Sequence, residues 1–285
     1  MQQKSKYPSH VYLNGQILPA GEAKISVFDR GFLFGDGIYE VMAQIHGRFF
    51  YGEAHLARLR RCLGEIDLAF DVSALDRDIP ALLEASGLTG QDCLLYIQVT
   101  RGTAPRQHAY PSGVQPTALM YAWAKALPDV NQAPASVVTR EDFRWARCDI
   151  KMTSLLGNVM ANQFAVEHDC YETLFVRNGV VTEASHCNVF FVREGVVFTH
   201  PANAFILDGI TRQVVLECCR DLGLECREEA VAAEAVGSMD EAFLTGTSTQ
   251  VMAIVSIDGK VIGRGETGAV TRSIQEAFRN LKVAG

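Results

Sequence analysis

Short apolar runs, each interrupted by an Xaa-Gly dipeptide, recur along the chain. Such a turn between two strand-like runs is typical of a β-hairpin. The four hairpins expected from this pattern span residues 11–18, 41–51, 173–181 and 188–198. Further strands are expected at residues 94–100, 118–123 and 143–150.

Apolar residues with helical spacing fill the intervals between these hairpins. In residues 53–68, for example, the leucines at positions 56, 59 and 63 share one face of a helix. The other helices are expected at residues 155–168, 211–222 and 267–281. A chain that mixes hairpins with helices in this way predicts an α+β fold.

A loop-like stretch with two prolines separates the chain into two expected domains. We expect a small α+β domain at residues 1–124, a linker at residues 125–135 and a larger domain at residues 136–285. A crevice between two domains is a usual place for a small-molecule site.

The composition is that of a globular protein, with 48% hydrophobic and 21% charged residues among 285. No apolar run approaches the roughly 20 residues that a bilayer helix needs. The net charge is −7, and the 26 basic and 33 acidic residues are interspersed along the chain. Because this leaves no continuous basic face, we expect no nucleic-acid partner and no membrane association. Residues 1–10 are polar and unlike a secretory signal, which predicts a cytoplasmic protein.

Eight cysteines are scattered along the chain without a Cys-x-x-Cys pair. No histidine spacing typical of a tetrahedral zinc site accompanies them. We therefore expect reduced, mostly buried thiols and no metal site.

Lysine is scarce, with seven residues against nineteen arginines, so candidates for a lysine nucleophile are few. Lys151 follows the strand expected at 143–150 and is flanked by Ile150 and Met152. An amine buried there would be neutral and able to condense with an aldehyde. The alternative is a lysine that extends to solvent from the end of a strand.

Two loops could bind an anion. Residues 207–212 place a glycine-containing turn before a helix, where free amides and the positive end of the helix dipole would face a phosphate. An ordinary capped helix is the alternative. Residues 245–249, Thr-Gly-Thr-Ser-Thr, offer hydroxyls and amides for the same purpose, or form only a polar turn.

Two further features could bind parts of a substrate or cofactor. Glu183 ends a hairpin strand and could keep a proton on a pyridine nitrogen, or it could be a solvated glutamate. The loop at 100–108 contains Arg101, Arg106 and His108. The planar fork of arginine binds carboxylates, although an exposed basic loop would have the same composition.

Six ordered segments together resemble the fold-type IV pyridoxal-phosphate enzymes, the class IV aminotransferases, and among them the D-amino-acid aminotransferases. These segments are residues 29–40, 55–59, 100–108, 147–151, 182–188 and 207–212. The resemblance extends over nearly the whole chain. It implies a pyridoxal 5′-phosphate cofactor at the domain interface, within the larger domain, and a homodimer.

The resemblance also implies roles for individual residues. Lys151 would carry the cofactor as a Schiff base and move the proton at the substrate Cα. Glu183 would pair with the pyridine nitrogen, and Tyr39 would stand beside the reacting centre. Arg106 and His108 would bind the substrate carboxylate, on a loop that comes from the partner subunit. The other residues expected to bind the cofactor are Arg58, Leu207, Ile210, Thr211, Gly246 and Thr247.

The reaction implied is a two-stage transamination, in which a D-amino acid such as D-alanine leaves its nitrogen on the cofactor. A 2-oxo acid such as 2-oxoglutarate or pyruvate then collects it. The segment Arg106-Gln107-His108 favours D-amino acids, whereas His186, Cys187 and Gly246 stand where D-specific relatives tend to carry serines. The alternatives are a branched-chain or (R)-amine transaminase, an aminodeoxychorismate lyase and a non-enzymatic cofactor-binding protein.

Overall fold

The computed structural model describes residues 7–284, so most of the polar N-terminal tail on which the localisation was predicted lies outside the described part. The chain divides into two compact units. The first runs to Ala126 and includes Ile150–Ser154, and the second contains Leu127–Asp149 and the chain from Leu155 onward. Helices and strands are mixed in both, which confirms the predicted α+β class.

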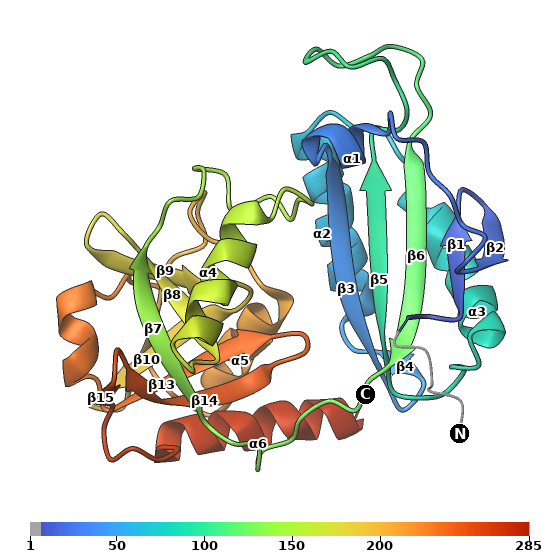
Figure 1. Cartoon of the computed structure of the whole chain (residues 1–285). Coiled ribbons are helices and arrows are strands. Elements are labelled where there is room, and N and C mark those ends of the chain that lie inside the picture. The colour runs from blue at the N-terminus through green and yellow to red at the C-terminus, as the bar shows by residue number, and fades with distance from the viewer. Residues whose placement is uncertain (1–6, 285) are drawn as a thin grey trace. The chain divides into compact units, whose positions relative to one another are not determined.

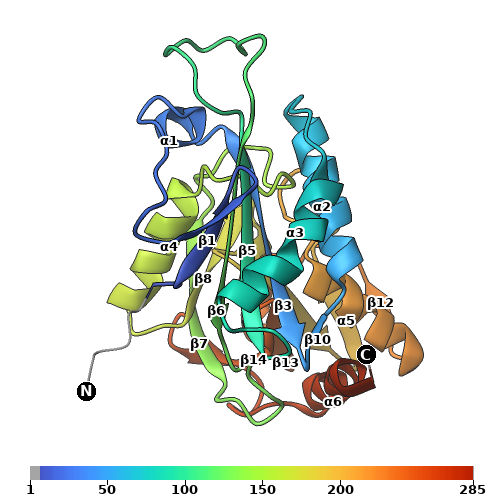
Figure 2. The same ribbon diagram turned by 90° about the vertical axis from the view of Figure 1, so that its right-hand side faces the viewer.

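The first unit is built on a six-stranded antiparallel sheet with strand order β2-β1-β6-β5-β3-β4. Its strands are β1 (His10–Leu13), β2 (Gln16–Pro19), β3 (Gly37–Ile45), β4 (Arg48–Phe49), β5 (Cys93–Thr100) and β6 (Thr117–Ala124), and its helices are α1 (Arg30–Phe34), α2 (Gly52–Glu65) and α3 (Val72–Ala85). In Figure 2, α2 and α3 lie against one face of this sheet. The buried leucines of α2 and α3 pack there on the apolar residues of β3 and β5 and form the core.

The second unit contains a nine-stranded sheet in which β14-β7-β8 are parallel and most other neighbours are antiparallel. Its strands are β7 (Ala135–Glu141), β8 (Glu172–Arg177), β9 (Val180–Ala184), β10 (Asn188–Arg193), β11 (Val196–Thr199), β12 (Cys226–Arg227), β13 (Glu241–Gly246), β14 (Gln250–Ile257) and β15 (Lys260–Val261). Its α-helices are α4 (Leu156–Glu167), α5 (Ile210–Asp221) and α6 (Ala269–Ala284), and a 3-10 helix spans Ala233–Ser238.

Side chains alternate between the two faces of this second sheet, as the pleat requires. Ala242 and Leu244 of β13 enter one apolar core. Phe243, between them, stacks on Phe190 with ring centroids 4.9 Å apart on the other face, where α5 and α6 cover the strand. Helix α4 covers β7 and β8, as Figure 1 shows. The α-helices therefore cover one face of the sheet, and the apolar core that contains Ala242 and Leu244 lies on the other face.

The four predicted hairpins and four predicted helices are confirmed, with shifts of a few residues at their ends. The strand predicted at 143–150 is wrong, because that segment is irregular and the strand, β7, lies earlier in the chain. The amide of Arg144 donates to the Asp142 side chain at 3.0 Å, a local bond that turns the backbone. Helix α3 was not predicted.

Lys151 lies on a short segment that pairs with β3 of the first unit. The Tyr39 amide donates to the Lys151 carbonyl oxygen at 3.0 Å, and the Thr153 amide donates to Gly37 at 2.9 Å. Met152 also forms an isolated bridge with Ile38. These bonds explain why the segment belongs to the first unit, whereas the domain boundaries predicted from the sequence placed it in the second.

Within residues 7–284, no helix combines the length and apolar character needed to cross a membrane.

Candidate active site

The pairing with β3 holds Lys151 next to Tyr39. Lys151 Nζ lies 4.2 Å from the centroid of the Tyr39 ring, and its side chain is half-buried. Across the described residues, Lys151 forms no ion pair with a carboxylate. The amine is thus positioned by its backbone and by an aromatic ring, without a counter-ion that would compete for it.

Glu40, which follows Tyr39 on β3, binds two side chains of α2. Arg58 donates to it from Nε at 2.7 Å and from Nη2 at 3.0 Å, and His55 Nδ1 lies 2.9 Å from its Oε2. Burial alone would raise the pKa of Glu40, but Arg58 and His55 outweigh it and hold the pKa of that carboxyl well below its usual range. Burial lowers the pKa of His55, against the opposing effect of its hydrogen bond with Glu40. Arg58 is therefore a buried cation fixed in place by Glu40.

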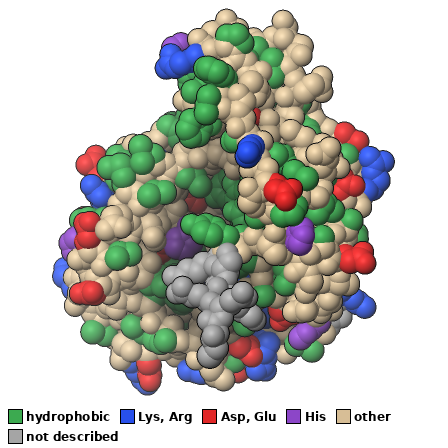
Figure 3. All heavy atoms as spheres, turned by 45° about the vertical axis from the view of Figure 1, so that its right-hand side comes forward, with side chains coloured by type: hydrophobic (Ala, Val, Ile, Leu, Met, Phe, Trp, Pro, Cys, Tyr) green, Lys and Arg blue, Asp and Glu red, His purple; other side chains and the backbone are tan. Residues whose placement is uncertain are grey.

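The loop between β5 and β6 carries Arg106 and His108, and both side chains are exposed. It extends beyond the end of its sheet in Figure 1, and in Figure 3 hydrophobic side chains lie along the flank of this projection. The Arg106 guanidinium lies 5.2 Å, and the His108 ring 5.7 Å, from the centroid of the Phe34 ring. Arg30 donates to the Gln107 carbonyl oxygen at 2.6 Å. The structure thus places the side chains of Arg106 and His108 against the same aromatic ring, Phe34 of α1.

In the second unit, Glu183 is a buried carboxylate with three hydrogen-bond donors. Its Oε1 accepts from Arg144 Nη1 at 2.7 Å, and its Oε2 accepts from the Leu207 amide at 3.0 Å and from Asn188 Nδ2 at 3.3 Å. Burial raises the pKa of Glu183 to about 7, against the opposing effect of the Arg144 guanidinium. A further cationic hydrogen-bond donor placed beside this desolvated carboxyl would stabilise its ionised form.

The first turn of α5 contains Ile210 and Thr211, both buried. Its N-cap, Gly209, provides no side-chain hydrogen bond. The neighbouring Asp208 carboxylate is occupied, since it accepts from Arg212 at 2.9 Å and from Gln213 at 3.0 Å. The helix therefore begins without a carboxylate or hydroxyl cap, as a phosphate-binding helix terminus requires.

Only glycine fits at the N-cap of α5, because a Cβ at Gly209 would lie 2.2 Å from Asn188 Oδ1. The loop between β13 and β14 also approaches its neighbours closely. A Cβ at Gly246 would lie 3.1 Å from Cys187 Sγ, and Thr247 next to it is half-buried.

Each unit, taken by itself, carries side chains whose chemistry would suit part of pyridoxal phosphate. In the first unit Lys151 could provide an amine for its aldehyde, and in the second Glu183 could provide a carboxylate for its ring nitrogen. The uncapped turn at Ile210 and Thr211, also in the second unit, could provide amides for its phosphate. Sequence reasoning missed Glu40 and Arg144, which hold Arg58 and Glu183. In the sequence, Glu40 was marked only by its position next to Tyr39, and Arg144 only as a charged residue within the strand expected at 143–150.

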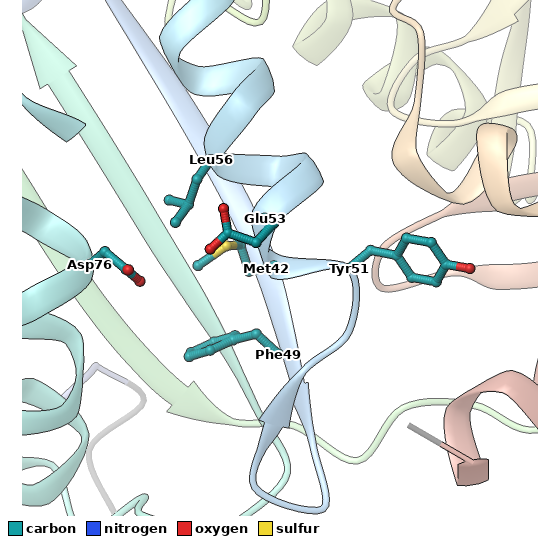
Figure 4. Close-up of a pocket in the computed structure, with 7 residues that line it drawn as sticks. Met42, Phe49, Tyr51, Glu53, Leu56 and Asp76 are labelled. Atoms are coloured by element: carbon teal, nitrogen blue, oxygen red, sulfur yellow. The ribbon is translucent and has the colours of Figure 1, made fainter. Parts of the chain in front are cut away.

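A separate pocket with a volume of about 390 Å³ lies in the first unit, and Figure 4 shows the side chains that line it. Met42, Phe49 and Leu56 point toward one another in it, whereas the ring of Tyr51 points away. The remaining lining residues are Gly52, Glu53 and Asp76. None of the predicted site residues lines this pocket, and we do not assign it to the active site.

Comparison with known proteins gives consistent matches. The family model described as "Amino-transferase class IV" matches residues 37–257. The chain is 39% identical over 273 residues to a D-alanine aminotransferase of Bacillus licheniformis, covering 95% of this chain and 96% of that one.

Two solved structures share the fold. The branched-chain amino acid aminotransferase of Escherichia coli has a TM-score of 0.89 at 22% identity, covering 96% of this chain and 94% of that one. A hypothetical aminotransferase from Mycobacterium tuberculosis, in its PLP-bound form, has a TM-score of 0.84 at 22% identity, covering 96% of this chain and 99% of that one.

Proposed function

Because the chain belongs to the class IV aminotransferases, we propose that it transfers amino groups from D-amino acids such as D-alanine to 2-oxo acids such as 2-oxoglutarate or pyruvate. The position of Lys151, an amine without a counter-ion beside Tyr39, carries the proposal of lysine-based chemistry. The preference for D-amino acids is supported by the Arg106-Gln107-His108 segment and by the D-alanine aminotransferases among the relatives.

Class IV aminotransferases are pyridoxal-phosphate enzymes. When bound, this cofactor supplies an aldehyde that condenses with amines and a ring that withdraws electrons from the substrate Cα. Lys151 Nζ would hold the aldehyde and then move a proton to and from Cα. Tyr39 would orient Lys151 through the contact at 4.2 Å.

The remaining site residues would bind the ends of the cofactor. Glu183, oriented by the Leu207 amide, would keep a proton on the ring nitrogen. Arg58 and the amides of Ile210 and Thr211 would hold the phosphate. Thr247 would add a hydroxyl to the phosphate site, beside Gly246.

Arg106 and His108 would bind the substrate carboxylate, and we propose that they do so in a homodimer. Large apolar side chains are exposed near this loop: Val27 is 63%, Phe28 57%, Phe32 69% and Tyr110 55% exposed. Apolar patches of this kind are typical of interaction surfaces. A cytoplasmic location remains a prediction from the sequence.

Half-reactions of the purified holoenzyme test the substrate class. We expect D-alanine and D-glutamate to convert the absorbance of the lysine-bound cofactor much faster than L-leucine or an aromatic amine. Faster conversion by L-leucine would instead indicate a branched-chain transaminase, and faster conversion by the amine an (R)-amine transaminase. Pyruvate released from aminodeoxychorismate without an amino acceptor would indicate the lyase.

The Lys151→Ala variant tests the role of the amine. We expect turnover to fall by at least the roughly 10²–10⁴-fold that acid–base catalysis contributes, while the circular dichroism spectrum stays unchanged. Borohydride reduction and peptide mapping should label residue 151 in the wild type. The matched control is Lys125→Ala, which removes an exposed lysine and should retain activity. Full activity of Lys151→Ala would refute the assignment.

A further inference from the structure

The second unit brings together three side chains that carry metal-ligand atoms and that the transamination chemistry does not use. We propose that Glu172, His186 and Cys187 form a binding site for a divalent transition-metal ion of the zinc type, with a fourth position open to solvent. The proposal departs from the sequence prediction of no metal site, which considered only cysteine and histidine spacing. Glu172 lies fourteen positions before His186, so no local motif indicates the cluster.

The three ligand atoms of the cluster lie close enough to one another to reach one ion after rearrangement. One carboxylate oxygen of Glu172, one ring nitrogen of His186 and Cys187 Sγ all lie within 4.8 Å of one another. Zinc binds oxygen, nitrogen and sulfur ligands at about 2.0–2.3 Å, so in a tetrahedral shell two of its ligands lie roughly 3.3–3.8 Å apart. The ion would therefore separate His186 Nδ1 from Glu172 Oε2, which lie 2.6 Å apart without it, and would draw in any ligand atom that lies farther away than this spacing.

The Glu172 carboxylate is fixed before any ion binds. It is fully buried, and its Oε1 accepts from the amides of Thr173 at 3.0 Å and Ser185 at 3.2 Å and from the Ser185 hydroxyl. Its Oε2 accepts from the His186 amide at 3.1 Å and lies 2.6 Å from His186 Nδ1. The backbone thus positions the carboxylate, and Oε2 is the oxygen that faces the imidazole.

The thiol of Cys187 is oriented by a second set of bonds. Its Sγ donates to Thr249 Oγ1 at 3.3 Å, and Tyr171 bonds to the same hydroxyl at 2.9 Å. Cys187 is only 4% exposed, whereas the His186 side chain is 46% exposed. An ion could therefore enter past His186 and keep one solvent ligand, as an open three-ligand zinc site does.

The types of ligand select the class of metal. One thiolate, one imidazole and one carboxylate suit zinc and its neighbours, whereas magnesium and calcium require oxygen ligands. Binding would break the Cys187 S–H bond and displace any proton shared by His186 and Glu172, and these protons would pass to solvent. The sulfur, nitrogen and oxygen lone pairs would form the bonds to the metal, without oxidation or reduction.

A nucleophilic cysteine is the rival interpretation, and the geometry disfavours it. The Cys187 thiol is buried and is held by its hydrogen bond to Thr249, whereas a reactive cysteine is partly exposed.

Metal titration of the holoenzyme tests the proposal. We expect Co²⁺ to bind one ion per chain, with the visible bands of tetrahedral cobalt, and Zn²⁺ to displace it. X-ray absorption of the zinc-loaded protein should show one sulfur neighbour together with nitrogen or oxygen neighbours. Neither measurement depends on transamination, so both remain informative if the proposed function fails.

Variants identify the ligands. Cys187→Ser should remove the sulfur neighbour, and Cys187→Ser and His186→Ser should each weaken binding by at least the roughly 10- to 100-fold seen when an outer-shell partner is lost. We use these two because Glu172→Gln alters a buried hydrogen-bond network. The matched control, Cys226→Ser, removes a half-buried thiol outside the cluster and should bind like the wild type. Unchanged affinity in both variants, a metal shell without sulfur, or no saturable binding would overturn the proposal.

Discussion

Glu40 in the first unit and Glu183 in the second are both buried carboxyls that accept a 2.7 Å hydrogen bond from an arginine. Their pKa values nevertheless shift in opposite directions, because the pKa of Glu40 falls and that of Glu183 rises to about 7. Burial works to raise both. The difference therefore reflects the charges and hydrogen bonds around each carboxyl, including the Asp142 carboxylate near Glu183.

Arg58 uses two nitrogens on Glu40, and His55 adds a third hydrogen bond. Arg144, by contrast, divides its donors between Glu183 and Asp142, a buried carboxylate that itself raises the pKa of Glu183. Two nitrogens of Arg58 donate to the one carboxylate of Glu40, whereas the positive charge of Arg144 is divided between the carboxylates of Glu183 and Asp142. This suits the proposed roles, since Glu40 would hold Arg58 in place and Glu183 would receive a protonated ring nitrogen.

The largest effect expected from this comparison is that of Glu40→Gln. Loss of the carboxylate removes the negative charge that accepts two hydrogen bonds from the buried Arg58 guanidinium, which should lower the free energy of unfolding by about 3–5 kcal/mol. Urea denaturation of the two proteins measures the difference. Glu53→Gln, which changes an exposed residue of α2, is the control and should have almost no effect. A loss below about 1 kcal/mol for Glu40→Gln would mean that the ion pair is no stronger than a surface pair.

The effect of Glu183→Gln on the free energy of unfolding should depend on pH in the opposite direction to that of Glu40→Gln. The pKa of Glu183 rises from its ordinary 4.5 to about 7 in the fold. The neutral carboxyl is therefore favoured in the fold, and its contribution to stability is present below pH 4.5 and is lost as the pH rises through 7. Glutamine stays neutral. In the cofactor-free protein, the free energy of unfolding of Glu183→Gln should therefore rise by about 3 kcal/mol relative to that of the wild type as the pH increases from 4 to 8.

Unfolding of the cofactor-free wild type and Glu183→Gln at several pH values measures this gain. For Glu40, whose pKa is lowered, the stabilisation is present above pH 4.5 and is lost as the pH falls. The advantage of the wild type over Glu40→Gln should therefore shrink in acid. The same slope for both variants would contradict the explanation that Arg58 directs two donors at Glu40 whereas Arg144 is divided between Glu183 and Asp142.

The features of the fold that are local in sequence were predictable. The Xaa-Gly hairpins follow from the left-handed conformation of residues such as Asn14 and Asn178, with φ of 50° and 52°. The family was also predictable and is confirmed, because six ordered segments carry it.

The predictions that failed depended on side chains acting at a distance or against a local pattern. The apolar residues at 143–150 suggest a strand, but Asp142 captures the Arg144 amide and turns the chain. Glu40 and Arg144 were missed for a related reason. Their partners, Arg58 and Glu183, lie 18 and 39 positions away, so only the fold brings each pair together.

Arg106→Ala gives the smallest effect and extends the comparison to an arginine that faces no carboxylate. Unlike Arg58 and Arg144, Arg106 is exposed, and within residues 7–284 it forms no ion pair. Its donors can therefore bind a substrate carboxylate, and a hydrogen bond to a charged group is worth about 1.5–3 kcal/mol.

We expect kcat/KM of Arg106→Ala for D-alanine to fall by roughly 10- to 150-fold, the kinetic equivalent of that energy. The rate with a carboxylate-free amine should hardly change, because such an amine offers no acceptor to the guanidinium. Arg60→Ala, which removes an exposed arginine of α2, controls for the loss of one positive charge. Equal losses for D-alanine and the amine would show that Arg106 supports the loop on Phe34 rather than binding the substrate, and the basis for a D-amino-acid preference would then fall with it.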